Sequence, residues 1–188
     1  MQALVSILPE PYYQAVEDIW FEMENKFGCQ HAYSRPKPHF TWQYAEGYEE
    51  DYTKVLDRVC TGLPTVEVRT DIITRFSNQD PVIFLRIVPT PDLLAVHKIL
   101  WDSLAPFWKN PVLFYQPGTW VPHITLSMDG SVWCAFDESQ DYLNNKDLRW
   151  TFKVDSLTML SLDHENAWST EKEFQFGLSD GIKTNPLT

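Results

Sequence analysis

One order of predicted elements occurs twice along the 188 residues of this chain. Each half is expected to run strand, helix, strand, helix, strand, so that Ala3 corresponds to Val82 and His39 corresponds to His123. No Gly/Ser-rich or charged linker separates the two halves. We therefore predict a single bilobal domain over residues 1–188, with one lobe at roughly 1–78 and the other at roughly 79–188.

Hydrophobic spacing and turn residues mark the individual elements. Apolar residues recur at helical spacing from Tyr12 to Phe27, and Gly28 is expected to end that helix. Thr90 and Pro91 are typical of a helix start, as the cap and the first helical position. The full set of predicted helices is 12–27, 48–63, 91–108 and 131–145, and the predicted strands are 3–8, 39–44, 65–76, 82–88, 120–128, 150–162 and 168–176, with a loop or irregular strand at 111–118. This pattern predicts the α+β class.

Composition excludes several kinds of protein. Hydrophobic residues make up 44% of the chain, which is enough for a core and argues against disorder. The net charge of -11 argues against binding to a long nucleic acid, because such binding depends on clustered Lys and Arg. No apolar run approaches the ~20 residues of a membrane span, and no secretory signal is evident. We expect no membrane partner.

Three cysteines, Cys29, Cys60 and Cys134, are widely spaced and odd in number. This usage is typical of free thiols in a reducing compartment rather than of a disulfide framework. The sequence therefore predicts a cytoplasmic protein, which we expect to be a monomer.

The two corresponding strands carry the same short pattern. Pro38-His39-Phe40-Thr41-Trp42 occurs in the first half and Pro122-His123-Ile124-Thr125-Leu126 in the second. Side chains at i and i+2 of a strand point to the same face. Each strand is therefore expected to present an imidazole and a hydroxyl on one face and two apolar side chains on the other.

Two histidines that face one phosphate can perform both proton transfers of an in-line displacement. A neutral imidazole takes a proton from the nucleophile, and a protonated imidazole gives one to the leaving group. The hydroxyl groups of Thr41 and Thr125 can donate to the non-bridging phosphate oxygens. This chemistry requires no metal, no other cofactor and no covalent intermediate.

These eight residues resemble the paired His-x-Thr/Ser-x motifs of the 2H phosphoesterase superfamily, which includes the 2′-5′ RNA ligase and cyclic phosphodiesterase proteins. The resemblance implies a duplicated fold of two antiparallel-sheet lobes, with helices outside and a central cleft. It implies a metal-independent hydrolase acting on a small nucleotide or an RNA end, such as a 2′,3′-cyclic phosphate or a 2′-5′ linkage. His39 and His123 would be catalytic, and Thr41 and Thr125 would bind the phosphate.

Other residues are candidates for binding the substrate. Arg35 and Lys37 precede the first motif, and Arg86 lies in the opening strand of the second half. Gln43 and Ser127 continue the faces of the two motifs. The candidates for stacking on a base are Tyr12, Tyr115, Trp120 and Trp168. For each of these residues the alternative is an ordinary place in the core or on the surface.

Other functions remain open on the sequence alone. The same site could bind a nucleotide or an RNA end without turning it over, or could join RNA ends by the reverse reaction. Cys29, His31 and His39 lack a fourth ligand at suitable spacing for zinc, so we predict no metal site. Neither a Gly-rich phosphate loop nor a nucleophile elbow is present in the sequence.

Overall fold

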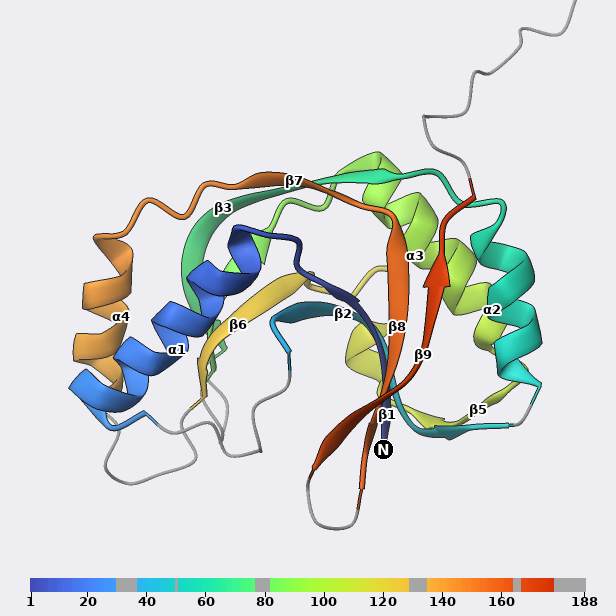
Figure 1. Ribbon diagram of the computed structural model, residues 1–188, viewed down its shortest axis with the longest axis horizontal. Coiled ribbons are helices and arrows are strands. Elements are labelled where there is room, and N and C mark those ends of the chain that lie inside the picture. Colours follow the sequence, from blue (N-terminus) through green and yellow to red (C-terminus); the bar gives the residue numbers. More distant parts are fainter. Residues whose placement is uncertain (30–36, 50, 77–81, 129–134, 164–166, 178–188) are drawn as a thin grey trace, which may run out of the picture.

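Antiparallel strands form one curled sheet that runs through the molecule (Figure 1). The computed structural model describes residues 1–29, 37–49, 51–76, 82–128, 135–163 and 167–177. Within these ranges the strand order is β7-β3-β4-β6-β2-β1-β8-β9, and β5 pairs with β2. The strands are β1 (Gln2–Ile7), β2 (His39–Tyr48), β3 (Val66–Phe76), β4 (Val82–Ile87), β5 (Trp108–Pro111), β6 (His123–Met128), β7 (Thr151–Val154), β8 (Ser156–Leu162) and β9 (Trp168–Gln175).

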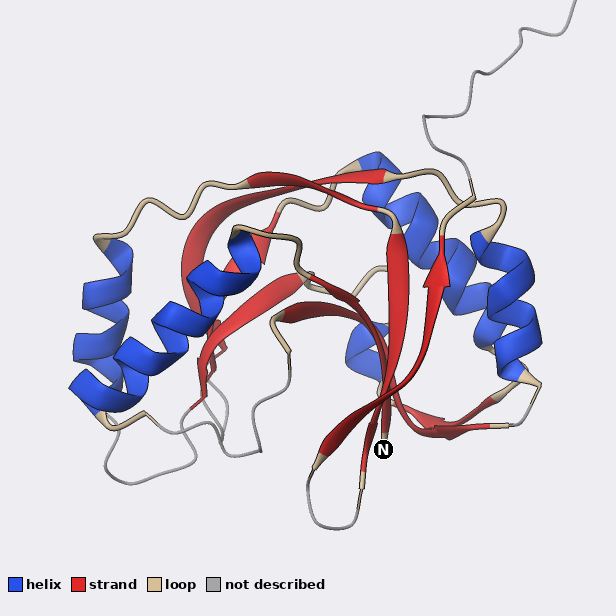
Figure 2. Ribbon diagram, in the orientation of Figure 1, coloured by secondary structure: helices blue, strands red, loops and turns tan. Residues whose placement is uncertain are grey.

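The helices pack in two pairs. They are α1 (Tyr12–Phe27), α2 (Tyr52–Cys60), α3 (Pro91–Leu104) and α4 (Phe136–Asn144), with a short 3-10 turn η1 at Leu113–Tyr115. The pair of α1 and α4 lies at one end of the sheet, and the pair of α2 and α3 lies at the other (Figure 2). The predicted α+β fold, with antiparallel strands and outer helices, is confirmed. The strands of the two halves join in one sheet where β2 pairs with β6.

The ends of two helices follow the sequence signals. Gly28 follows α1 with φ of 65°, a left-handed conformation that glycine adopts without steric cost. The Thr90 side chain accepts a hydrogen bond from the Leu93 amide, and Pro91 occupies the first helical position of α3. Both predicted helix ends are confirmed.

Other element bounds differ from the predictions for reasons of pairing. Residues 48–51 were predicted to be helical, but β2 extends to Tyr48 because Gly47 and Tyr48 pair with Lys109 and Trp108 of β5. The predicted strand over 150–162 divides at Asp155, since β7 pairs with β3 and β8 pairs with β1. Of the helix predicted at 131–145, residues 131–134 lie outside the described residues.

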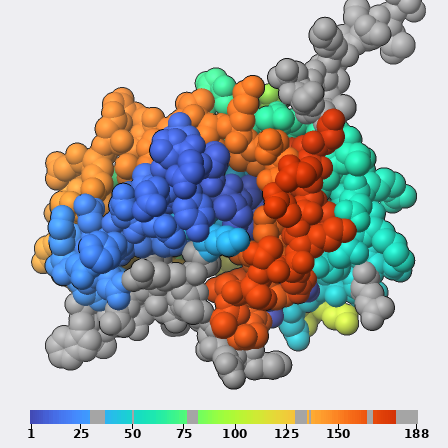
Figure 3. All heavy atoms as spheres, in the orientation of Figure 1, coloured from blue at the N-terminus to red at the C-terminus, as the bar shows by residue number. Residues whose placement is uncertain are grey.

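The main core lies between the helices and one face of the sheet. Phe40, Trp42, Ile124 and Leu126 are fully buried there, which confirms the apolar face that both motifs predict. They pack with residues of α1 and α3, namely Val16, Ile19, Trp20, Met23, Leu93, Val96, Leu100 and Leu104. In Figure 3, α1 lies across the viewed side of the molecule.

The cysteines differ in whether they are free thiols. Cys29 is disulfide-bonded, so the prediction of a free thiol is wrong for this residue. Sequence spacing could not show this, because folding and not spacing decides which cysteines meet. Cys60 is a free buried thiol, and burial raises its pKa to about 12. Cys134 lies outside the described residues. The disulfide removes the main support for a reducing compartment.

In the described part of the chain, no helix is both long enough and apolar enough to cross a membrane.

Candidate active site

The two motifs lie side by side at the centre of the sheet. β2 and β6 run antiparallel, and Phe40 stands opposite Ile124. Because both of these side chains point into the core, the flanking residues point to the other face, which we call the motif face. Extending the register by one residue brings His39 next to Thr125 and Thr41 next to His123. The structure thus gathers two imidazoles and two hydroxyls on one face.

The two imidazoles are oriented by the same local contact. Nδ1 of His39 lies 2.6 Å from the carbonyl oxygen of Lys37, and Nδ1 of His123 lies 2.8 Å from that of Val121. A carbonyl oxygen only accepts, so Nδ1 carries the hydrogen in both rings. In the neutral imidazole the lone pair is then on Nε2.

Both imidazoles favour the neutral form. Burial lowers the pKa of His39 below 6.5, the Lys37 carbonyl opposes this, and the charge of His123 lowers it further. Burial likewise lowers the pKa of His123, against the effect of the Val121 carbonyl.

Aromatic side chains flank the first motif. The Tyr115 phenol lies near the Thr41 side chain, and burial raises the pKa of this phenol to about 12. The Tyr44 ring lies 6.4 Å from that of Tyr115 and 6.5 Å from that of Trp168, measured between centroids. We call these three residues, Tyr44, Tyr115 and Trp168, the aromatic wall. It includes two of the four stacking candidates from the sequence.

The other two stacking candidates lie elsewhere. Tyr12 donates its hydroxyl hydrogen to the Thr151 carbonyl and packs on Phe152. Trp120 is only 7% exposed and is stacked on His97, a buried histidine of α3. Both belong to the core, so the sequence interpretation of these two as base platforms is wrong.

A charged pair and two phenylalanines flank the second motif. Arg86 is paired with His123 across β4 and β6 and therefore shares the motif face. Its guanidinium forms a two-bond ion pair with the Asp71 carboxylate, and these bonds lower the pKa of Asp71. Phe84 and Phe76 lie against the His123 ring, with centroids 5.0 and 5.3 Å away. The charge of Arg86 is thus already matched inside the protein.

Gln43 and Ser127 do not share the motif face, so this sequence prediction is wrong. Each follows a β-bulge, where one extra residue shifts the alternation of side chains. The pairing of β1 with β2 shifts between Leu4 and Val5, so that Gln43 stands opposite Leu4, a core residue. Both Gln43 and Ser127 are 1% exposed, and Gln43 Nε2 and Ser127 Oγ have no hydrogen-bond partner.

The second motif has a bulge at the position equivalent to that of the first bulge. The register of β4 with β6 shifts between Ile83 and Phe84, which places Ser127 opposite the core residue Ile83. Beyond the first bulge it is Tyr44 that returns to the motif face, opposite Ala3. Sequence reasoning missed Tyr44 because strict alternation assigned that face to Gln43.

The basic residues before the first motif are only partly described. The Lys37 side chain is exposed, and its backbone carbonyl orients His39. Arg35 and His31 lie outside the described residues. Among the residues that are described, no group of three or more His, Cys, Asp or Glu side chains is placed to hold a metal ion.

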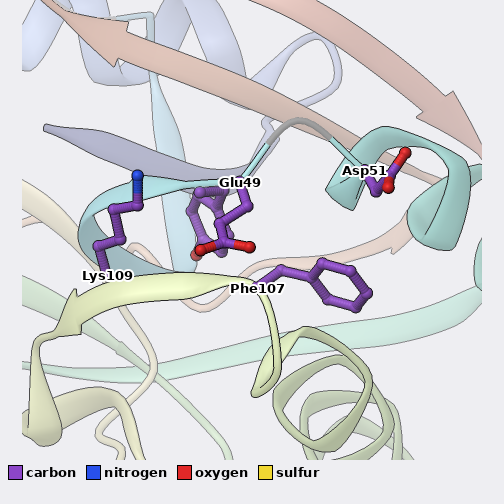
Figure 4. Close-up of a pocket in the computed structure, with 5 residues that line it drawn as sticks. Glu49, Asp51, Phe107 and Lys109 are labelled. Carbon is purple, nitrogen blue, oxygen red and sulfur yellow. The ribbon is translucent and has the colours of Figure 1, made fainter.

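A pocket of about 390 Å³ lies at the other end of β2 and is not the motif site. It is lined by Tyr48, Glu49, Asp51, Phe107 and Lys109 (Figure 4). The carboxylate of Asp51 is paired with Lys54, 2.6 Å away. The pocket contains neither histidine of the motifs, so we assign it no catalytic group.

Known structures share this fold. TT0787 of Thermus thermophilus superposes with a TM-score of 0.66 at 16% identity, over 94% of this chain and 98% of that one. E. coli LigT complexed with NADP+ superposes with a TM-score of 0.59 at 16% identity, over 93% of this chain and 96% of that one. Kluyveromyces marxianus Usb1 superposes with a TM-score of 0.50 at 13% identity, over 90% of this chain and 96% of that one. These likenesses establish the fold.

The sequence itself matches a family model. No curated protein sequence matches the chain significantly. Residues 8–166, which include both motifs and the strands that carry them, match the model of the 2′-5′ RNA ligase superfamily. The chain therefore belongs to the 2′-5′ RNA ligase superfamily, the 2H phosphoesterases that its paired motifs resemble.

Proposed function

We propose that this chain is a metal-independent phosphodiesterase that acts on a small nucleotide or an RNA end. One observation carries the proposal above all others. The imidazoles of His39 and His123 lie on paired strands, each with Nδ1 bonded to a backbone carbonyl and Nε2 left for chemistry. A pair of this kind supplies one proton acceptor and one proton donor to a phosphate between them.

The reaction on a 2′,3′-cyclic phosphate follows from these two nitrogens. Nε2 of one neutral histidine takes a proton from water as the water oxygen bonds to phosphorus. The bond from phosphorus to one ribose oxygen breaks, and the other histidine, protonated at Nε2, gives its proton to that oxygen. The first ring ends protonated and the second neutral, so proton exchange with solvent restores the starting state.

The threonine hydroxyls would hold the phosphate during this reaction. Thr41 and Thr125 share the motif face with the imidazoles, and each stands next to the histidine of the other strand. Hydroxyl donors aimed at the non-bridging oxygens stabilise the charge that develops in the transition state.

The aromatic wall supports a substrate that carries a base. Tyr44, Tyr115 and Trp168 lie beside the first motif and offer ring surfaces on which a base can stack. E. coli LigT, which shares the fold, has been crystallised with NADP+ and with 3′-AMP. The net charge of -11 favours a small substrate over a long nucleic acid.

A product assay with excess EDTA tests the proposal. Wild type would be incubated with 2′,3′-cyclic mononucleotides, ADP-ribose cyclic phosphate, 2′-5′ and 3′-5′ dinucleotides and cyclic dinucleotides. The matched control is the double variant His39→Asn, His123→Asn. An Asn amide can still donate to the Lys37 or Val121 carbonyl, but it lacks the Nε2 base.

The outcomes separate the candidate functions. Turnover by wild type in EDTA, absent from the double variant, supports the proposal. Ligand that binds and returns unchanged would instead indicate a binding module. Loss of activity on chelation would contradict metal-independent chemistry. A joined product from 2′,3′-cyclic phosphate and 5′-hydroxyl RNA ends would indicate the ligase direction.

A further inference from the structure

Each motif accepts a hydrogen bond from a buried indole at the same position, the backbone carbonyl oxygen of its threonine. Nε1 of Trp120 donates to the carbonyl oxygen of Thr41, and Nε1 of Trp20 donates to that of Thr125, each at 3.0 Å. The donors come from unrelated elements, since Trp20 lies in α1 and Trp120 precedes β6. Both tryptophans are 7% exposed or less. The duplicated motifs thus receive an equivalent contact that the sequence repeat itself does not contain.

These carbonyls need a donor because the sheet is interrupted beside them. Over their described lengths, β2 and β6 pair at a single position, Phe40 with Ile124. A bulge follows each threonine, at the register shifts opposite Leu4/Val5 and Ile83/Phe84. Regular ladder bonds are lost at such points, and a buried carbonyl without a donor is destabilising. The indoles supply the missing hydrogen bonds.

Trp120 also joins the two motifs directly. It lies three residues before His123 and bonds to the strand that carries His39. Its indole is fixed from two sides, by Trp42 at 5.5 Å and by His97 at 3.9 Å between ring centroids. A shift of this indole would therefore change the position of the His123 segment relative to β2.

We propose that Trp20 and Trp120 are positioning residues that set the spacing of His39 and His123 through the carbonyls of Thr41 and Thr125. The catalytic part of this inference rests on the proposed function. The geometric part does not, because the spacing of the two imidazoles can be measured without substrate. Proton transfer needs the two Nε2 atoms on either side of one phosphate, and a displacement of about 1 Å can cost about 100-fold in rate.

The test uses Trp20→Phe and Trp120→Phe, which remove the N–H and keep an aromatic ring. Trp150→Phe is the control, since Trp150 packs on Tyr12 beside β7. Where a phenylalanine variant fails to fold, 3-benzothienylalanine at the same position removes the N–H and preserves the shape of the indole. Circular dichroism and thermal melts verify the fold of each protein.

The first measurement is an NMR titration of the imidazoles of His39 and His123 without substrate. We expect the pKa of His39 to rise in both indole variants, because a more distant His123 lowers it less and water enters the gap. The control should titrate like wild type. Unchanged titration in both folded indole variants would overturn the positioning role, whether or not a substrate is known.

The second measurement is steady-state kinetics on a substrate that wild type turns over. We expect kcat to fall about 10- to 100-fold in each indole variant with KM changed less than about three-fold, since the substrate contacts remain. A merely structural role predicts no loss beyond the unfolded fraction, and that result would contradict the inference. If wild type turns over nothing while the titrations shift as expected, the proposed function fails and the positioning role stands.

Discussion

The imidazole of His97 stacks on the indole of Trp120, with the ring planes at 13° to each other. Nε2 of His97 lies 2.9 Å from the Tyr115 carbonyl oxygen, which makes Nε2 the donor there. Burial lowers the pKa of His97 to about 4, although the backbone carbonyls of Tyr115 and Trp42 oppose the change. A neutral buried histidine thus supports the segment that carries Tyr115 towards Thr41.

His97 makes the free energy of unfolding depend on pH in the acidic range. The pKa of His97 is about 4 in the folded chain and near 6.5 in the unfolded chain, so the unfolded state binds the proton more readily. The stability that neutral His97 contributes is present above pH 6.5 and is lost as the pH falls through 4. The shift corresponds to roughly 3 kcal/mol. Urea denaturation at several pH values should show a weaker acid dependence in His97→Gln, and equal slopes would contradict this assignment.

If the proposed reaction holds, each motif histidine should govern one limb of the pH–rate profile. We expect His39→Asn or His123→Asn to lower kcat by about 10²- to 10⁴-fold, because each removes one proton transfer. The variant that lacks the base should lose the acidic limb, and the variant that lacks the acid should lose the alkaline limb. Residual activity measured across pH therefore assigns the two roles. A single variant with full activity would exclude the two-histidine reaction.

The optimum of kcat/KM should lie below pH 6.5. Burial lowers the pKa of both imidazoles below this value, so the protonated form that acts as the acid is lost as the pH rises towards neutrality. The neutral form that acts as the base is lost as the pH falls further. The pH profile of kcat/KM, which reports on the free enzyme, is then bell-shaped with its maximum at acidic pH. Bound phosphate stabilises the imidazolium, so kcat should peak at higher pH than kcat/KM. An alkaline optimum of kcat/KM would contradict the lowered pKa values of these two imidazoles.

The sequence predicted those features of the fold that depend on local chemistry. The Thr90-Pro91 start of α3 and the Gly28 end of α1 follow from backbone geometry, and both are present. The motif histidines and threonines follow from strand alternation, which holds up to the bulges. Beyond each bulge alternation fails, because the extra residue is set by pairing with another strand. That single effect buried Gln43 and brought Tyr44 to the motif face.

Contacts between distant segments were not accessible from the sequence. The bond from Trp120 to Thr41 joins residues 79 positions apart, and the bond from Trp20 to Thr125 spans 105. The ion pair of Arg86 with Asp71 depends on how β3 and β4 align. The disulfide of Cys29 likewise depends on folding. Residue identity indicates which groups can bond, but only the topology decides which of them meet.

The threonine hydroxyls should contribute to catalysis in similar measure. Thr41→Val and Thr125→Val keep the shape of the side chain and remove the donor to phosphate. We expect kcat/KM to fall about 10- to 100-fold, since a hydrogen bond to a charged group contributes about 1.5–3 kcal/mol. Thr151→Val, an exposed substitution on β7, is the matched control. Kinetics in which the motif variants resemble this control would show that the hydroxyls do not bind the phosphate.

Removal of the buried Ser127 hydroxyl should leave the protein at least as stable as wild type. Ser127 Oγ is buried without a hydrogen-bond partner, so its desolvation is not offset. We expect Ser127→Ala to raise the free energy of unfolding by about 1 kcal/mol. Ser6→Ala is the contrasting variant, because the buried Ser6 hydroxyl donates to the Ser156 carbonyl and accepts from Trp42 Nε1. This second variant should be destabilised by about 1–3 kcal/mol. Urea denaturation compares the stabilities of the two variants. Steady-state kinetics of Ser127→Ala test whether the Ser127 side chain lies on the core face. A raised KM in that variant would show that the hydroxyl reaches the substrate after all.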